Sequence, residues 1–263
     1  MARCVVDAWG VVMKVALHNL TVSYQRRPAV HHVSVEFPLG TASAVFGPNG
    51  AGKSTILKAM MGLVRPDHGR IELQGLTRQQ MAYLPQASGL DRSLPVSVLD
   101  TVLAGAWHRV GVWGGVGADG VTRALAALAS VGLHGFEARG IGQLSGGQFQ
   151  RVLFARILMQ DAQLILLDEP FASVDSKTTH DLLALVQHWV DEGRTVIAVL
   201  HDAAQVRSHF SHTLLIAREP IAWGRSEDVL TEEQLLRANH IATHWLAHPP
   251  VCRRDDSMEA GLS

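Results

Sequence analysis

Apolar and polar positions alternate in the first third of this chain. Residues 15–23 do so loosely and residues 30–37 more regularly, with Val33, Val35 and Phe37 on one face. The short segments 69–75 and 81–86 are also apolar and bounded by turn-forming residues. Such alternation is typical of strands with one buried face. The four segments together predict a small antiparallel sheet.

Unbroken apolar runs replace this alternation farther along the chain. They occupy residues 42–46, 164–167, 195–200 and 213–217. Runs of this kind are typical of strands buried on both faces of a parallel sheet. Helical segments at 56–61, 149–159 and 178–192 separate them. This order predicts βαβ units with right-handed crossovers.

Residues 87–141 lack any strand pattern. A helix is expected after Pro95 and a second one over residues 121–131, with a five-glycine loop at 111–120 between them. The expected fold is therefore an α/β phosphate-loop core with an antiparallel β subdomain and an inserted helical subdomain at about 87–141.

Composition narrows the class of protein. The chain has 263 residues, 47% of them hydrophobic, and a formal net charge of -1, so no global basic field favours nucleic acid or lipid. The two cysteines, Cys4 and Cys252, lie at opposite ends of the chain, which argues against a disulfide framework. This cysteine usage fits the reducing cytoplasm. No apolar run reaches the length of about 20 residues that a membrane span needs. We expect an N-terminal extension at 1–13, the main domain at 14–236, and a terminal helix with a disordered tail at 237–263.

One nine-residue segment fits the phosphate-loop pattern G-x-x-x-x-G-K-[ST] in full. It reads Gly47, Pro48, Asn49, Gly50, Ala51, Gly52, Lys53, Ser54 and Thr55. An apolar strand precedes it and a helix follows, so successive backbone N–H groups can surround a phosphate at the positive end of the helix. Lys53 is expected to reach the β- and γ-phosphates, and the Ser54 hydroxyl to hold Mg²⁺. The segment predicts binding of a nucleoside triphosphate.

Two carboxylates follow the apolar run at 164–167. A buried strand would deliver Asp168 to the edge of the sheet, where it can hold Mg²⁺ directly or through water. Glu169, the next residue, is placed to orient or deprotonate an attacking water. The alternative is that both carboxylates are merely solvated at a strand end. The phosphate loop upstream makes that interpretation weaker than a role in the nucleotide site.

The segment 144–148, Leu-Ser-Gly-Gly-Gln, predicts a second anion-binding helix N-terminus. One nucleotide does not need two such sites from one chain. A head-to-tail homodimer resolves this, with the segment of one chain capping the γ-phosphate held by the phosphate loop of the other. With these motifs, the sequence closely resembles the nucleotide-binding subunit of ATP-binding cassette (ABC) proteins, over about residues 14–236.

The resemblance assigns further roles. Tyr24 corresponds to the aromatic residue that stacks on adenine, and Gln86 to the glutamine that touches Mg²⁺ or the attacking water. The signature motif falls on Ser145, Gly146, Gly147 and Gln148. Asp175 corresponds to the residue that couples the two sites, and His201 to the histidine that contacts the γ-phosphate. All the catalytic positions carry the residues usual for the family, which implies an active ATPase with ATP and Mg²⁺ as cofactors. Phe149, next to the signature, departs mildly from the family pattern and does not affect this expectation.

The resemblance also implies transport. The segment between Lys53 and Ser145 is too short for the coiled-coil arm of DNA-structure ABC proteins, and a single phosphate loop excludes tandem translation factors. Without a membrane segment, the permease subunits would be separate chains, with this chain peripheral on the inner face of the cell membrane. Residues 85–103 and 169–175 are similar to those of the zinc and manganese importer ATPases, and the general similarity favours zinc over manganese.

Other interpretations stay open. One is an ATPase of a siderophore or heme importer, and another is a cytosolic ABC ATPase of the iron–sulfur assembly type without a permease. In the favoured interpretation a periplasmic or lipoprotein metal-binding protein is an indirect partner, and nucleic acid is not a partner. His240, His244 and His248 recur on one helical face, where incidental histidines are favoured over a metal site.

Two smaller features carry expectations of their own. His31 and His32 are expected in a solvated turn. Trp107 and Trp113 are expected either to pack within the helical insertion or to line the permease contact.

Overall fold

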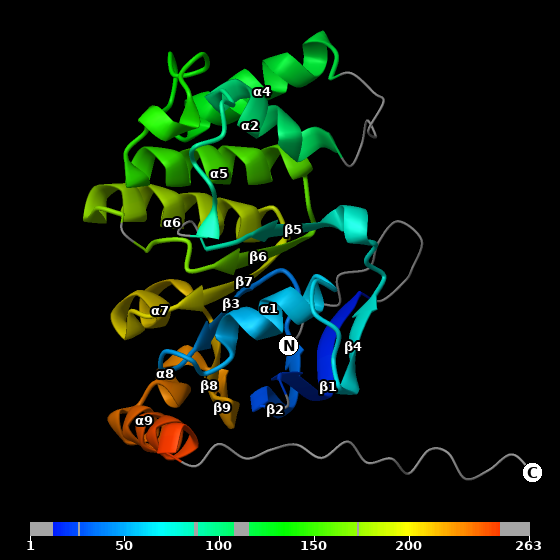
Figure 1. The fold of residues 1–263 in the computed structure, drawn as a ribbon, viewed down its shortest axis with the longest axis vertical. Coiled ribbons are helices and arrows are strands. Elements are labelled where there is room, and N and C mark those ends of the chain that lie inside the picture. The colour runs from blue at the N-terminus through cyan, green and yellow to red at the C-terminus, as the bar shows by residue number, and fades with distance from the viewer. Residues whose placement is uncertain (1–12, 26, 87–88, 108–115, 173, 248–263) are drawn as a thin grey trace, which may run out of the picture.

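A computed structural model describes residues 13–25, 27–86, 89–107, 116–172 and 174–247. Its centre is a six-stranded sheet in the order β5-β6-β7-β3-β8-β9 (Figure 1). The strands are β5 (Met81–Leu84), β6 (Leu164–Asp168), β7 (Thr195–Leu200), β3 (Ala42–Phe46), β8 (His212–Ala217) and β9 (Glu219–Arg225). The first five are parallel and β9 is antiparallel to β8. The unbroken apolar runs are thus confirmed as buried parallel strands.

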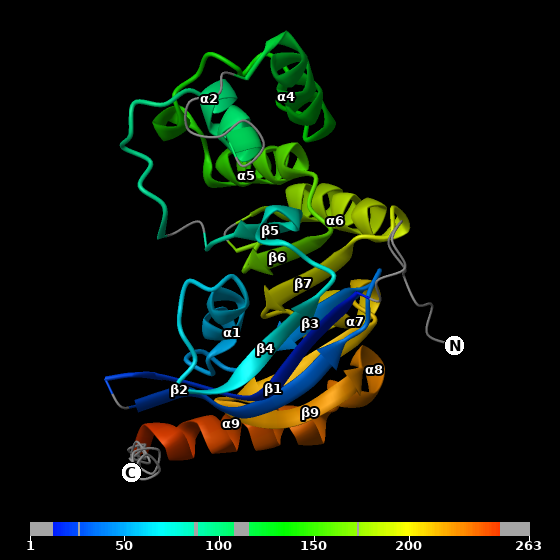
Figure 2. The ribbon, with the colours of Figure 1, turned by 90° about the vertical axis from the view of Figure 1, so that its right-hand side faces the viewer.

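A second, antiparallel sheet has the order β2-β1-β4 and lies beside the first (Figure 2). Its strands are β1 (Lys14–Tyr24), β2 (Arg27–Phe37) and β4 (His68–Gln74). Buried residues alternate along β2, as its sequence pattern requires for a strand with one face on a core. The antiparallel sheet is confirmed, with three strands where the sequence predicted four.

The prediction that the fourth segment, 81–86, belongs to the antiparallel sheet is wrong. Its strand β5 pairs in parallel with β6 at the edge of the six-stranded sheet. Three of its four residues are buried, and the helix α5 (Gly146–Gln160) packs against it. A short apolar segment does not reveal the direction of its partner, so the pattern alone could not place it.

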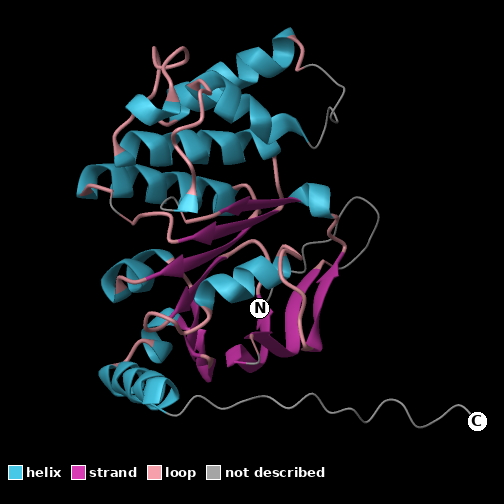
Figure 3. Ribbon diagram, in the orientation of Figure 1, coloured by secondary structure: helices cyan, strands magenta, loops and turns pink. Residues whose placement is uncertain are grey.

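Helices cover both faces of the six-stranded sheet (Figure 3). They are α1 (Lys53–Met60), α5 (Gly146–Gln160), α6 (Ser176–Asp191), α7 (Ala203–His209), α8 (Ser226–Val229) and α9 (Glu232–Ala247). The inserted region supplies α2 (Val98–Leu103) and α4 (Ala118–Ser130), which pack on α5 at one end of the molecule. The helical insertion is confirmed, whereas α7, α8 and β9 were not predicted.

Two hydrophobic cores lie on opposite faces of the six-stranded sheet. Leu164 and Leu166 of β6 enter the core shared with α1 and the antiparallel sheet. Ile165 and Leu167 enter the core shared with α5, α6 and the helical region. This alternation follows from the pleat of a strand. It places residue 168, the next even position, on the same face as α1.

Candidate active site

The segment 47–52 makes the turn from β3 into α1 with backbone that only glycine adopts readily. Gly47, Gly50 and Gly52 have φ values of 154°, 76° and 91°. A Cβ on Gly47 would lie 2.0 Å from the Ile216 carbonyl oxygen, and one on Gly52 would lie 2.1 Å from the Ala29 carbonyl oxygen. The loop is therefore fixed between β8 and β2. A hollow of about 270 Å³ opens over it, lined by Ala29, residues 49–55 and Glu169.

Lys53 is folded back over this loop. Its Nζ donates to the Gly47 carbonyl at 2.8 Å and to the Pro48 carbonyl at 2.9 Å. The side chain is 6% exposed. Burial lowers the pKa of Lys53, while the nearby Glu169 and Asp168 carboxylates act against that shift. An anionic phosphate in the hollow would give this ammonium a better partner than two neutral carbonyls.

Asp168 lies at the carboxyl end of β6 and faces α1, as the pleat requires. Its Oδ1 accepts from Ser54 Oγ at 2.8 Å and its Oδ2 accepts from Tyr83 Oη at 3.1 Å. Burial raises the pKa of Asp168, and the two hydroxyl donors act against that rise. Burial, followed by the charge of Asp168, also raises the pKa of the Tyr83 hydroxyl.

The donor set at Ser54 and Asp168 fits Mg²⁺. A hydroxyl and a carboxylate are hard oxygen ligands, and Mg²⁺ takes one or two such groups together with substrate phosphates and water. When bound, the ion would neutralise charge on the phosphate oxygens. The two oxygen atoms already contact each other across the phosphate loop and β6, so the chain brings the ligands together by itself.

Glu169 stands one residue beyond β6 and joins three strand ends. Its Oε1 lies 2.6 Å from His201 Nε2, and its Oε2 accepts from Gln86 Nε2 at 2.7 Å. Gln86 follows β5 and His201 follows β7, which flank β6 in the sheet. Glu169 has a φ of 51°, in the left-handed region that non-glycine residues adopt at a cost of roughly 1–2 kcal/mol. The surrounding contacts hold this carboxylate in place.

The structure therefore brings together Lys53, Ser54, Gln86, Asp168, Glu169 and His201. It does so at the carboxyl ends of adjacent parallel strands, where α/β sheets place their ligands. Sequence reasoning missed Tyr83. That residue pairs with Leu166 in the register of β5 and β6, so its orientation toward Asp168 became visible only when β5 was placed beside β6.

The signature residues form a separate group at the N-terminus of α5. Ser145 caps the helix and accepts from the Gln148 backbone N–H at 3.2 Å, and Gln148 Oε1 accepts from the Ser145 backbone N–H at 3.0 Å. Such reciprocal capping leaves other N–H groups of the first turn available. A Cβ on Gly147 would lie 3.5 Å from Asp175 Oδ2. Among the described residues, the lining of the phosphate-loop hollow includes none of the segment 145–148.

Asp175 has a structural contact of its own. It caps α6 by accepting from the Thr178 backbone N–H at 2.9 Å and from Thr178 Oγ1 at 2.8 Å. The backbone and then the hydroxyl of Thr178 lower the pKa of Asp175. Arg151 of α5 donates to Thr178 and Asp181. Asp175 and the signature end of α5 are consequently one packed unit.

The remaining predicted residues are scattered. Tyr24, at the end of β1, is 47% exposed. Trp107 is 67% exposed, so the alternative that it packs within the helical insertion is wrong. Trp113 lies outside the described residues. Phe149 is 3% exposed, with the Arg92 guanidinium 5.0 Å from its ring centroid.

The histidine predictions had different outcomes. The solvated turn at His31 and His32 is wrong: both belong to β2, and their rings touch edge to face. His240 and His244 lie on α9, whereas His248 lies outside the described residues. In the part of the chain that the structure describes, no group of three His, Cys, Asp or Glu side chains is placed to hold a metal ion.

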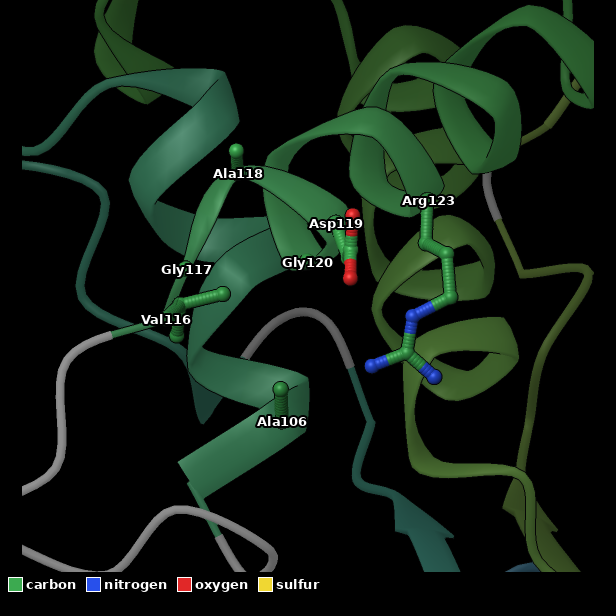
Figure 4. Close-up of a pocket in the computed structure, with 7 residues that line it drawn as sticks. All are labelled: Ala106, Val116, Gly117, Ala118, Asp119, Gly120 and Arg123. Atoms are coloured by element: carbon green, nitrogen blue, oxygen red, sulfur yellow. The ribbon is translucent and has the colours of Figure 1, made fainter.

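A second hollow lies in the helical region, far from the carboxylates. It measures about 340 Å³ and is lined by Ala106, residues 116–120 and Arg123 (Figure 4). The Arg123 side chain and the Asp119 carboxylate lie near each other on successive turns of α4 in this view. None of the helices in the described ranges is both long and apolar enough to span a bilayer.

Known proteins match this chain over most of its length. A family model described as ABC transporter matches residues 30–172. The manganese transport system ATP-binding protein MntB of Bacillus subtilis is 40% identical, over 84% of this chain and 90% of its own length. The zinc transport system ATP-binding protein TroB of Treponema pallidum is also 40% identical, over 85% and 86%. The dimeric ATP-binding cassette MJ0796, bound to ADP and phosphate, superposes with a TM-score of 0.71 at 27% identity, over 81% of this chain and 98% of its own.

Proposed function

The chain belongs to the ABC transporter family and is an ATPase of that family. From this premise we propose that it powers import of a divalent metal ion, zinc or manganese, through membrane subunits encoded as separate chains. The observation that supports a metal cargo is the 40% identity to relatives named for manganese and zinc transport. The network of Gln86, Glu169 and His201 at the strand ends supports the ATP hydrolysis that would drive this transport.

In the proposed reaction, the phosphate loop and Lys53 hold the triphosphate, and Ser54 with Asp168 hold Mg²⁺. Glu169 accepts a proton from the attacking water. Its contacts with Gln86 and His201 orient the carboxylate before ATP arrives. His201 is then positioned to hold the γ-phosphate, and Gln86 to report occupancy of the site toward the helical region.

The second half of the site would come from another copy of the chain. The signature end of α5 has capped but available N–H groups, and these favour an anion. A head-to-tail homodimer would place them on the γ-phosphate held by the partner's phosphate loop. The dimeric likeness of the MJ0796 cassette supports this arrangement. Asp175, packed beside Gly147, would lie where the two sites meet.

The helical region is the proposed contact with the permease. Leu94 and Trp107 are 54% and 67% exposed there, at the two ends of the segment that contains α2. Large exposed apolar side chains on one region favour a protein partner. Contact with that permease would hold the ATPase at the inner face of the membrane, and a metal-binding protein on the outer side would deliver the ion.

The test is the metal content of cells that lack this chain, measured by mass spectrometry under metal limitation. The cells are complemented with the intact chain, with Glu169→Gln, or with Glu233→Gln as a control on the exposed start of α9. We expect a fall in zinc or manganese that the intact chain and the control restore and Glu169→Gln does not. A fall in manganese alone excludes zinc as the cargo, and the reverse excludes manganese. Unchanged metals would overturn metal import and leave an ABC ATPase with another cargo.

A further inference from the structure

Arg218 is the single residue between β8 and β9, and its backbone joins three parts of the molecule. Its φ of 66° lies in the left-handed region. Its N–H donates to the carbonyl of Ala51 in the phosphate loop at 2.9 Å, and its own carbonyl accepts from the N–H of His31 in β2 at 2.7 Å. The phosphate loop and the antiparallel sheet are therefore both attached to this one turn.

The side chain of Arg218 makes a second set of contacts. Its Nη1 donates to the carbonyl of Pro28 at 3.0 Å. Its guanidinium carbon lies 5.6 Å from the ring centroid of Trp245 in α9, within the range of a cation–π contact. Trp245 is 8% exposed and also meets the His31 ring edge to face, with centroids 5.9 Å apart. The helix α9 covers this group from the side of β8 and β9 (Figures 1 and 2).

The segment that Arg218 contacts, Pro28 and Ala29, forms a wall of the phosphate-loop hollow. Ala29, next to Pro28, lines that hollow. Its carbonyl oxygen would be 2.1 Å from a Cβ on Gly52, so the strand lies directly against the phosphate loop. A shift of residues 28–29 would move the wall on which Gly52 rests. Contacts to Pro28 on one side and Ala51 on the other thus act on the same loop.

We propose that Arg218 is a positioning residue of the phosphate loop, through which Trp245 and the C-terminal helix α9 set the affinity for nucleotide. The backbone of Arg218 holds Ala51, and its guanidinium, kept in place by the Trp245 ring, holds Pro28. Helix α9 acquires a role in nucleotide binding that its distance along the chain from the phosphate loop does not suggest. The inference rests on nucleotide binding alone and is independent of the transported ion.

The test measures affinity of the full-length chain for Mg-ADP, using a fluorescent ADP analogue, together with the KM and kcat for ATP. We expect Arg218→Ala to weaken binding about five- to tenfold and to raise KM by a similar factor while kcat stays within about twofold. Trp245→Ala should act in the same direction by a smaller factor. Arg218→Lys and Trp245→Phe, which keep a cation and a ring, should recover part of the loss.

Two further variants separate the side chain from the backbone and from folding. Arg218→Gly removes the guanidinium but adopts a φ of 66° freely, so it should weaken binding as Arg218→Ala does. Leu236→Ala, at a 63% exposed position of α9, is the control and should bind normally. Unchanged affinity in Arg218→Gly, or a lowered unfolding temperature with unchanged affinity in Arg218→Ala and Trp245→Ala, would overturn the proposal. Failure of the unmodified chain to bind Mg-ADP would instead overturn nucleotide binding itself, and the proposal with it.

Discussion

The carboxyl edge of the six-stranded sheet and the N-terminus of α5 both present groups suited to a nucleotide, but they differ in completeness. At the sheet edge the polar side chains contact one another: Ser54 meets Asp168, and Glu169 meets both Gln86 and His201. At the start of α5, among the residues that the structure describes, the side chains of Ser145 and Gln148 form hydrogen bonds only with each other's backbone. The side chains of the first region are assembled within one chain, whereas the second region offers groups that the proposed dimer would bring to a nucleotide on the partner.

The difference has a physical origin. Parallel strands end at one edge, so residues from distant parts of the sequence meet there without a partner. A helix N-terminus offers unpaired N–H groups and a positive potential, which are useful only when an anion is brought to them. In the proposed head-to-tail dimer, each chain would carry parts of two composite sites. Variants that act on one region and spare the other can test this division.

The largest effect is expected from Glu169→Gln. Loss of a general base lowers turnover by about 10²- to 10⁴-fold. The amide can still contact Gln86 and His201, so ATP binding should persist and a closed dimer should accumulate. Phosphate release and size-exclusion chromatography with ATP measure the two effects. Turnover within a few-fold of the unmodified chain would remove Glu169 from the role of base.

The next effect concerns the signature region. Gly147→Ala adds a methyl group whose nearest atom would be 3.5 Å away, so the fold should tolerate it. Mg-ADP binding by the single chain should be unchanged. ATP hydrolysis should fall by about tenfold or more, since in the proposed dimer the methyl group would keep the γ-phosphate of the partner's ATP from the backbone donors of α5.

A mixing experiment makes the same comparison sharper. Lys53→Ala damages the phosphate loop and Gly147→Ala the signature. A head-to-tail dimer of one chain of each kind has one site with both defects and one intact site, so mixing the two impaired proteins should raise hydrolysis above that of either one alone. If the signature acted within its own chain, no site would be intact. Absence of any restoration would therefore contradict the composite site.

A smaller effect is expected at Tyr24, at the end of β1. Stacking of an aromatic ring on a base contributes about 1–3 kcal/mol. Tyr24→Ala should accordingly weaken ADP binding about fivefold or more, and Tyr24→Trp should preserve it. The side chain is 47% exposed, so the unfolding temperature should not change. Equal affinity in all three proteins would remove Tyr24 from the adenine site.

The smallest effect is one of stability and has the opposite sign. Burial raises the pKa of Asp168 in the folded chain above the ordinary value of 3.8. A carboxyl whose pKa is raised by folding destabilises the fold once it ionises, so this cost is complete above the folded-state pKa and disappears as pH falls below 3.8.

Asp168→Asn removes this cost at neutral pH. The free chain should unfold at a slightly higher temperature, while hydrolysis should be lost with the proposed Mg²⁺ ligand. Thermal unfolding without nucleotide at neutral and at mildly acidic pH measures the gain, which should shrink as the pH falls. A lower unfolding temperature at neutral pH would show that the ionised carboxylate stabilises the fold.

Much of the central sheet could be predicted because its strands are unbroken apolar runs. The glycine and lysine spacing of 47–55 likewise predicted the phosphate loop, whose glycines do take positive φ values. The strand β9 was not predicted, because its sequence contains Pro220 and shows neither a clear alternation nor an apolar run. In the structure its residues are only half-buried or exposed. Its place at the sheet edge explains why it can carry that proline.

The errors came from contacts between distant segments. His31 and His32 look like a polar turn, yet β2 continues through them because the Arg218 carbonyl accepts from the His31 N–H and Trp245 covers the ring. Neither contact can be inferred from neighbours in the sequence, since the contacting residues lie on other elements. Trp107 was predicted either to pack in the helical insertion or to line the permease contact, and its 67% exposure excludes the first of these.

The sequence by itself determined the residue types needed to bind and cleave a triphosphate, because the backbone geometry of a phosphate loop and the apolar pattern of a buried strand are local requirements. Only the tertiary structure decided that β5 lies parallel to β6, which places Tyr83 on Asp168 and Gln86 on Glu169. It also decided that Arg218 joins the phosphate loop to α9. Strand pairing and side-chain contact depend on which surfaces can be buried together, and that is a property of the whole chain.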